Sequence, residues 1–220
     1  MKINFFLILT VLFGLLFSCS SAVEDNVQKK KEQKKSVVES KLIPYSDFLK
    51  NLNWKKGNTK QKEEKFFKFV STDLIKYWKG TEWDFNGVTR TPKQGNIACG
   101  YFVTNTLTDF GLKIKRVWLA QQASSVMIKK ICESSSIKTY SDFDKFKSYF
   151  KTRKKNEIFI VGLDYHTGYI VKEGENIYFL HSYFVNKQGV IKEKIDKSDA
   201  LKSSNIFVIG SLSANSSLFK

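Results

Sequence analysis

The chain contains few of the residues that carry thiol and metal-ligand chemistry. Its 220 residues include two histidines and three cysteines, and nothing in their spacing has the form of a zinc ligand set. The sequence also lacks an internal repeat, an aromatic ribonucleoprotein motif and a basic helix. Its formal net charge of +16 comes from lysines scattered along the chain. We therefore expect an anionic environment, such as acidic lipid headgroups or an anionic cell-wall polymer, and no nucleic-acid partner.

The first residues have the composition of a secretory signal. Lys2 precedes an apolar stretch, residues 5–17, which is too short for a comfortable membrane span. The run Leu16-Phe17-Ser18-Cys19 resembles a bacterial lipobox. This resemblance implies a signal peptide over residues 1–18, lipidation of Cys19, and a chain lipid-anchored to a membrane of the bacterial cell envelope, on its periplasmic or surface side. An ordinary signal peptide, or a membrane anchor with an incidental cysteine, is the alternative.

Composition divides the remaining chain into a tether and one domain. Residues 19–43 are polar and lysine-rich, and cannot bury enough apolar surface to fold, so we expect a flexible tether. A single domain is expected over residues 44–213, followed by a loose tail over 214–220. Helices are predicted at 47–52, capped by Ser46, and at 60–78, 97–110, 120–132 and 141–151; strands are predicted at 157–163, 166–171, 176–181 and 205–212. Helices followed by antiparallel strands indicate an α+β fold.

Cys99 is the strongest candidate for a functional residue. It falls in the first turn of the helix predicted over residues 97–110, whose apolar positions recur at +3 and +4 and which ends at Gly111. The positive end of a helix dipole lowers the pKa of a thiol, and a neighbouring imidazole can hold the thiolate as an ion pair. We therefore expect a reactive thiol at this position.

The two histidines occupy neighbouring ends of a predicted hairpin. His166 begins one strand and His181 ends the next, so the two rings are expected to meet at the sheet edge on which the Cys99 helix packs. Gly168 shares the strand face of His166 and leaves space beside it. This arrangement suits acyl transfer, with Cys99 as nucleophile, His166 as general base and then acid, and His181 fixing the ring of His166.

With these motifs in place, residues from about Thr81 to Tyr183 resemble the NlpC-type papain-like cysteine peptidases, which trim bacterial peptidoglycan. The counterparts of the family pattern are Trp83-Asp84-Phe85-Asn86-Gly87, Pro92, Gly95, Ala98-Cys99-Gly100-Tyr101-Phe102-Val103, Gly111, Arg116, Gln121 or Gln122, His166-Thr167-Gly168 and Leu180-His181-Ser182. The sequence departs from that pattern at Ala98, Gly100 and Trp83, where the family commonly has aspartate, serine and tyrosine.

The resemblance implies a papain-like domain in which the cysteine begins a helix packed on an antiparallel sheet. It also implies a catalytic set of Cys99, His166 and His181, and cleavage of amide bonds in peptidoglycan stem peptides or another envelope amide, without a cofactor. Trp83, Asn86 and Tyr101 are the candidates for the oxyanion site and substrate pocket, together with the backbone amide of Cys99. The competing hypothesis is an inactive module of the same fold that binds cell-wall glycopeptide or an envelope protein.

Other interpretations of these residues remain open. Cys132 ends an apolar helical stretch and is expected to pack in the core. A disulfide between Cys99 and Cys132 would remove the nucleophile, and a zinc site built from Cys99, His166 and His181 is a less favoured alternative. The helical segment 44–78 can cover the cleft, contribute to the core or present a partner surface.

Overall fold

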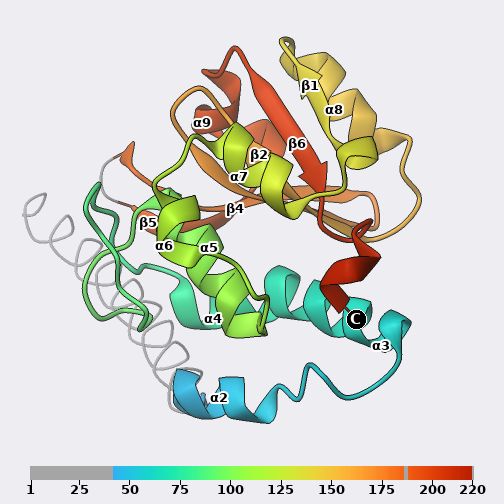
Figure 1. Cartoon of the computed structure of the whole chain (residues 1–220). Helices are drawn as coiled ribbons and strands as arrows, with labels where there is room; N and C mark the ends of the chain where they lie inside the picture. Colours follow the sequence, from blue (N-terminus) through green and yellow to red (C-terminus); the bar gives the residue numbers. More distant parts are fainter. Residues whose placement is uncertain (1–41, 186–187, 220) are drawn as a thin grey trace, which may run out of the picture. The chain divides into compact units, whose positions relative to one another are not determined.

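The computed structural model describes residues 42–185 and 188–219 (Figure 1). Tyr45–Lys220 form one compact unit. The expected signal peptide, Cys19 and nearly all of the expected tether lie outside the described residues. Among the helices of the described part, none combines the length and the apolar character needed to cross a membrane.

The elements follow one another as helices first and mainly strands afterwards. The helices are α2 (Tyr45–Asn51), α3 (Thr59–Lys68), the π-helical turn η1 (Phe69–Asp73), α4 (Leu74–Trp78), α5 (Cys99–Phe110), α6 (Arg116–Ala120), α7 (Ser124–Ile131), η2 (Ser134–Ser136), α8 (Phe143–Lys151), η4 (Ile195–Lys197), α9 (Asp199–Lys202) and η5 (Ser216–Phe219). The strands are β1 (Lys138–Tyr140), β2 (Glu157–Gly162), β3 (Thr167–Glu173), β4 (Asn176–Tyr183), β5 (Gly189–Lys194) and β6 (Phe207–Ser211). The predicted α+β class is confirmed.

The strands of the described chain form one six-stranded antiparallel sheet in the order β1-β6-β2-β3-β4-β5. The hairpin β3–β4 lies inside this sheet, because β2 flanks β3 and β5 flanks β4. The sequence analysis placed the histidine-bearing strands at a sheet edge, and this was wrong. The prediction did not include β5, whose residues Gly189–Lys194 are charged at half of their positions and lack a clear apolar run.

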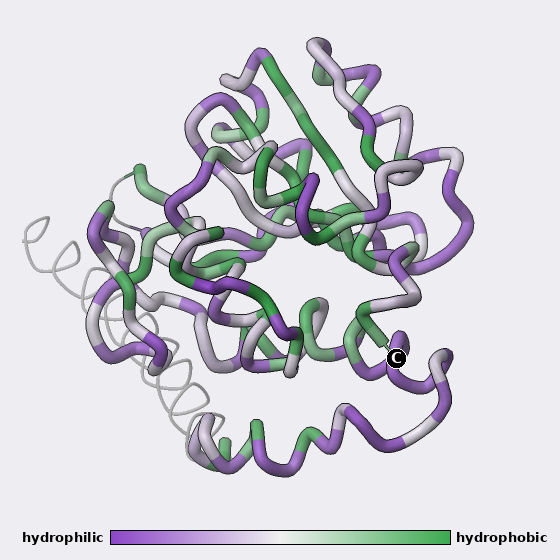
Figure 2. Tube along the Cα trace, viewed as in Figure 1, coloured by the Kyte–Doolittle hydropathy of each residue, from purple (hydrophilic) through white to green (hydrophobic). Residues whose placement is uncertain are grey.

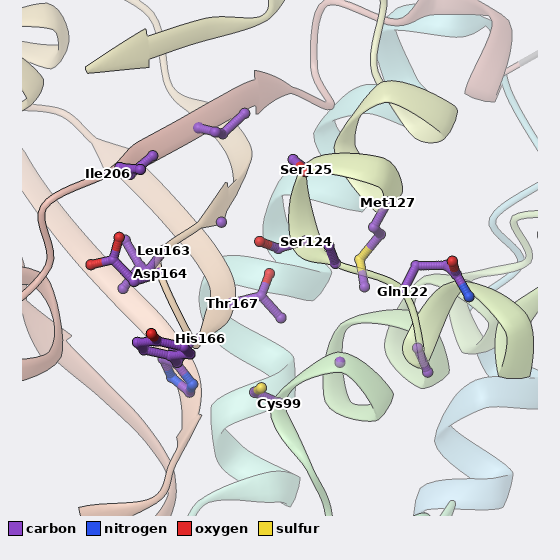
Figure 3. Close-up of a pocket in the computed structure, with 16 residues that line it drawn as sticks. Cys99, Gln122, Ser124, Ser125, Met127, Leu163, Asp164, His166, Thr167 and Ile206 are labelled. Carbon is purple, nitrogen blue, oxygen red and sulfur yellow. The ribbon is translucent and has the colours of Figure 1, made fainter. Parts of the chain in front are cut away.

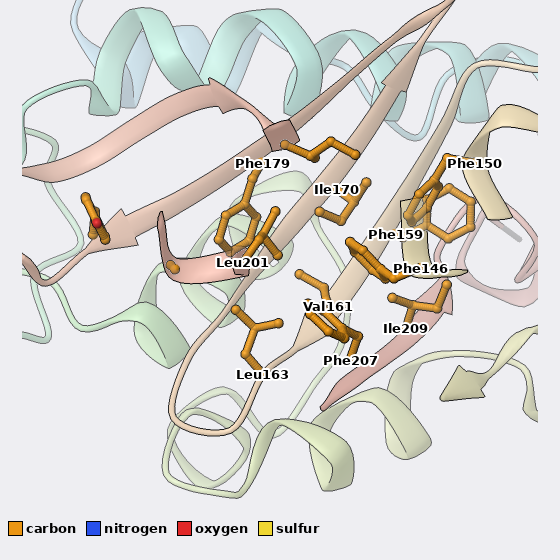
Figure 4. Close-up of a cluster of buried hydrophobic side chains, with 13 residues drawn as sticks. Phe146, Phe150, Phe159, Val161, Leu163, Ile170, Phe179, Leu201, Phe207 and Ile209 are labelled. Carbon is orange, nitrogen blue, oxygen red and sulfur yellow. The ribbon is translucent and has the colours of Figure 1, made fainter. Parts of the chain in front are cut away.

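The sheet is covered on both faces. On one face, Phe146 and Phe150 of α8 and Leu201 of α9 pack on alternate strand residues in the hydrophobic cluster of Figure 4. On the other, α5 packs on β3 and β4, and α7 packs on β2 and β6. Figure 2 shows β6 as hydrophobic along most of its length, whereas the segment that joins α8 to β2 is hydrophilic. The core therefore lies directly against the sheet.

The first helices contribute to this core. A capping box at Asn58 starts α3, and α3, η1 and α4 run on from one another over the predicted range 60–78. Phe69 and Trp78 are fully buried; the ring of Phe69 lies 5.4 Å from that of Phe110, and Trp78 lies 5.8 Å from Phe102. Of the three roles left open for segment 44–78, the buried side chains of α3, η1 and α4 assign these elements to the core, whereas α2 has no buried residue.

Several predicted helices have different bounds. The helix expected over 120–132 is α7, Ser124–Ile131, and the separate short helix α6 precedes it and ends where the Ala120 carbonyl reaches Gly100 of α5. A Cβ on Gly100 would collide with that oxygen, so glycine permits the close approach of these two helices. The first helix begins at Tyr45, and Ser46 lies within it and does not cap it.

The loose tail expected over 214–220 is not loose in its described part. Phe219 is fully buried, and its ring lies 5.5 Å from that of Phe66 in α3. The side-chain amide of Asn215 donates a 2.7 Å hydrogen bond to the carbonyl of Ile131. The short polar sequence concealed this docking, because a single aromatic residue carries no periodic pattern.

Replacing Phe219 by alanine should therefore destabilise the fold. Deleting a fully buried aromatic side chain costs about 3 to 5 kcal/mol, and urea unfolding followed by tryptophan fluorescence measures the change. Ser216→Ala, at an exposed position of the same turn, is the control and should change the free energy of unfolding by less than about 0.5 kcal/mol. Equal effects of the two substitutions would show that the tail does not dock.

Candidate functional site

The site begins at the N-terminus of α5. Cys99 is the first residue of this helix, Ala98 is its N-cap, and Gly111 ends it in the left-handed conformation with φ of 110°. The predicted first-turn position of Cys99 is confirmed. The helix starts two residues later than expected, because the backbone of Ile97 pairs with Val88 and its amide donates to the carbonyl of Glu82.

Buried hydrogen bonds fix α5 on the strands that carry the histidines. The Tyr169 hydroxyl of β3 donates to the carbonyl of Val103 at 2.9 Å and lies 2.8 Å from the Thr106 hydroxyl. The Ser182 hydroxyl of β4 donates to the carbonyl of Ile97 at 2.7 Å. Tyr169 and Ser182 are fully buried. These contacts hold the start of the helix, and with it Cys99, over the β3–β4 hairpin.

The two histidines meet as the sequence predicted. His166 immediately precedes β3, and its Nε2 lies 2.8 Å from Nδ1 of His181 on β4. Their exposed fractions are 6% and 0%. Because Nε2 of His166 is engaged with His181, Nδ1 is the ring nitrogen of His166 that can act on a thiol.

Gly168 makes room for this pair. A Cβ at residue 168 would lie 2.7 Å from Cβ of His181 and 2.7 Å from the ring of Phe179. The rings of Phe179 and His181 stack with their centroids 3.9 Å apart. Glycine thus lets His181 lie close to β3, within reach of His166.

Glu193 extends the series of hydrogen-bonded side chains that begins with His166 and His181, and it was not predicted from the sequence. Nε2 of His181 lies 3.1 Å from Oε1 of Glu193 on β5. His181 pairs across the ladder with Ile191, so Glu193, two residues further on, shares its face of the sheet. Glu193 could have been predicted only if Gly189–Lys194 had been recognised as a strand beside β4. The charged residues of this segment do not show the pattern of a strand.

Cys99 and His166 line two adjoining cavities. One, of about 420 Å³, is bounded further by Ser124, Ser125 and Asp164 (Figure 3). The other, of about 640 Å³, contains all three predicted pocket residues, Trp83, Asn86 and Tyr101. Tyr165 and Phe184, which are 96% and 43% exposed, line the larger one. The predicted nucleophile, base and pocket residues thus lie around one continuous region.

Trp83 has an unsatisfied donor at this place. Its indole Nε1 is buried and has no hydrogen-bond partner, although buried donors are nearly always paired. The loop that carries Trp83 is held next to β5, since the amide of Gly80 donates to Val190 and the amide of Val190 donates to Thr81. Trp83 thus lines the cavity that Cys99 lines, and its covered indole N–H has no hydrogen-bond partner in the structure.

The expected low pKa of Cys99 is not observed. Burial raises the pKa of the thiol, and the backbone amides of Thr167, Gly100 and Cys99 lower it by less. Burial and the neighbouring His181 hold the pKa of His166 well below its ordinary value. The prediction of a lowered thiol pKa was wrong, because it considered the helix dipole and not the cost of desolvating a charge. Both groups are neutral at rest.

The other two groups, His181 and Glu193, differ in charge: the imidazole is neutral and the carboxyl is ionised. Burial also lowers the pKa of His181, and Glu193 opposes this shift incompletely. For Glu193, burial raises the pKa, but hydrogen bonds with His181 and Ser198 and the charge interactions with His181 and Lys202 together outweigh it, so the pKa of this carboxyl is below its usual range. The site at neutral pH therefore holds a thiol, two neutral imidazoles and a carboxylate.

The structure shows neither the disulfide nor the metal site that the sequence left open, within the described residues. Cys99 and Cys132 are both free thiols, so the disulfide considered for them is not formed. Cys132 is 6% exposed in the core, as predicted, and burial raises its pKa to about 12. Within the described residues, no group of three or more His, Cys, Asp and Glu side chains has a geometry suited to a metal ion. His166 and His181 bond to each other through the nitrogens that face one another.

No protein-family model, curated protein sequence or solved structure matches this chain.

The neutral histidine pair predicts how stability depends on pH. The folded-state pKa values of His166 and His181 lie below the ordinary value of 6.5, so the unfolded chain binds more protons once the pH falls below about 6.5. Their contribution to stability is complete above that pH and is lost as the pH falls toward the folded-state pKa values. Between pH 7 and pH 5 we expect a loss of about 1 to 2 kcal/mol.

Urea unfolding of the full-length chain at pH 7 and pH 5 measures this loss. The chain has two histidines, so a variant with His166→Gln and His181→Gln removes the whole histidine contribution. Burial raises the pKa of Asp109, and this opposing effect is common to both proteins. Wild type should lose more stability than the variant, and equal losses would mean that the rings are not buried in the neutral form.

Proposed function

We propose that the protein is a thiol hydrolase with a papain-like, NlpC-type domain, which cleaves an amide bond through an acyl-enzyme on Cys99. The observation that carries this proposal is the common cavity: Cys99 and His166 both line it, while His181 lies 2.8 Å from Nε2 of the His166 ring. A nucleophile, a base and an orienting group are the requirements of covalent acyl transfer.

The resting charges favour general-base catalysis. As Sγ of Cys99 attacks the substrate carbonyl carbon, Nδ1 of His166 takes the thiol proton, and the C–O π electrons move onto the oxygen. Collapse of this intermediate breaks the C–N bond, and His166 returns the proton to the leaving amine. Water, deprotonated by His166, then attacks the thioester carbonyl; the C–S bond breaks, the acid leaves, and His166 returns the proton to the Cys99 sulfur.

We propose two donors for the oxyanion. Trp83 lines the cavity and its indole N–H has no hydrogen-bond partner in the structure, and the backbone amide of Cys99 lies at the positive end of α5. The Asn86 side chain lines the same cavity, but its exposed position and the absence of a buried, unpaired donor make it second to Trp83.

The substrate and location are proposed from the sequence. The resemblance to NlpC-type peptidases supports peptidoglycan stem peptides as the amide substrate, and the net charge of +16 favours approach to an anionic wall. The lipobox-like segment supports a lipid anchor in the bacterial cell envelope. An inactive module that binds wall glycopeptide or an envelope protein is the second candidate, because the raised pKa of Cys99 also fits an unreactive thiol.

Digestion of purified cell wall separates the two candidates. Wild type should release muropeptide fragments, detected by chromatography and mass spectrometry, and Cys99→Ala and His166→Ala should each reduce the release by at least about 10³-fold. Cys132→Ala removes the other described thiol, in the core, and should retain activity. Release that survives Cys99→Ala would refute the proposed chemistry, and binding to the wall without any release would favour the inactive module.

Trp83→Phe tests the proposed oxyanion donor. The substitution removes a buried donor that has no partner, so the free energy of unfolding should stay the same or rise. The rate of acyl transfer should fall by about 10²-fold. Thermal unfolding and the initial rate of wall digestion measure the two effects on the same protein. A parallel loss of stability and activity would indicate a structural role for the indole instead.

A further inference from the structure

The candidate site contains a carboxylate that the proposed reaction does not yet use. Glu193 lies on β5, the outermost described strand on that side of the sheet, and its Oε1 is 3.1 Å from Nε2 of His181. The chain has 21 acidic residues and 37 lysines and arginines. Because basic residues are in excess, a lysine or arginine would be the expected partner of this carboxylate. Its side chain instead meets a buried, neutral imidazole.

The carboxylate determines which nitrogen of His181 carries the proton. An ionised carboxylate can only accept hydrogen bonds, so Nε2 of His181 must donate its proton to Glu193. A neutral imidazole has one N–H, and Nδ1 of His181 is therefore an acceptor. The carboxylate thus fixes the tautomer of His181.

The same constraint passes to the next ring. Nδ1 of His181 accepts at 2.8 Å, so Nε2 of His166 must be the donor. Nδ1 of His166 is then unprotonated, with its lone pair free. This is the nitrogen that the proposed mechanism needs as the base for Cys99.

We propose that Glu193 is a positioning residue that fixes the tautomers of both imidazoles and so keeps Nδ1 of His166 ready to accept the thiol proton. This inference rests on the proposed thiol-hydrolase function. When His166 becomes an imidazolium during attack, Glu193 also supplies the compensating negative charge through His181. No proton needs to leave His181 in either step.

The neighbourhood of Glu193 fits this role. Ser198, which is fully buried, bonds the carboxylate from the N-cap position of α9, and Lys202 of α9 favours its ionised form. Tyr183 on β4 is the other titratable group that interacts with it. The carboxylate thus has partners on α9 as well as on β4.

The first test reads the tautomers directly and requires no substrate. In ¹⁵N NMR spectra of the full-length protein at neutral pH, both rings should be protonated at Nε2, and the His166→Gln and His181→Gln spectra assign the two signals. Glu193→Ala should introduce an Nδ1-protonated population at His166. Glu193→Gln keeps the shape of the side chain and an acceptor oxygen, so its effect on the tautomers should be smaller. This variant still tests the inference if the alanine variant misfolds.

A matched control comes from the same sheet. Glu173 ends β3, is part-exposed and pairs with Lys192 at 3.4 Å, away from the histidines. Glu173→Gln removes a carboxylate from another strand of the sheet, β3, and should leave both ring tautomers unchanged. If the Glu193 variants also leave the tautomers unchanged, Glu193 does not act on the rings and the inference is overturned.

The second test measures acylation with p-nitrophenyl acetate, a small activated ester, followed by release of p-nitrophenolate. Glu193→Ala should lower kcat by about 10- to 100-fold with KM within about two-fold of wild type, and Glu173→Gln should match wild type. Wild type that has the expected tautomers but does not acylate would refute the hydrolase function and leave the role of Glu193 on the rings intact. An active wild type with unaffected Glu193 variants would refute the role of Glu193 alone.

Discussion

The docking of α5 on the β3–β4 hairpin is the contact on which the candidate site depends. Tyr169 and Ser182 hold this helix through buried hydrogen bonds to Val103 and Ile97, and a buried donor or acceptor left without its partner costs about 1 to 3 kcal/mol. These bonds therefore set where the helix begins relative to the strands. The position of the Cys99 sulfur relative to His166 follows from them.

The same geometry explains why the thiol is neutral at rest. The close packing that brings α5 onto the sheet, with Gly100 against Ala120 and Gly168 against His181, also buries the two rings and leaves Cys99 only part-exposed. Desolvation penalises the charged form of each group, and it outweighs the helix dipole and the backbone amides at Cys99. Precise placement and a preformed thiolate are therefore in conflict at this site.

The sequence predicted the parts of this site that depend on local pattern. The apolar spacing up to Gly111 placed Cys99 at a helix start, and the hairpin between His166 and His181 brought the rings together. It did not predict Glu193, because β5 has a charged, weakly apolar sequence and its position beside β4 is a long-range pairing. Nor did it predict the raised pKa of Cys99, since burial is a property of the packed fold and not of the residues around position 99.

Strand β5 links two parts of the site that are far apart in sequence. Val190 holds the chain that leads to Trp83, and Glu193, three residues later, meets His181. Outer strands open more readily than central ones, because one of their edges has no partner strand. Local fraying of β5 would therefore release Trp83 and Glu193 together, so the candidate site would come apart through a sub-global opening well before the core unfolds.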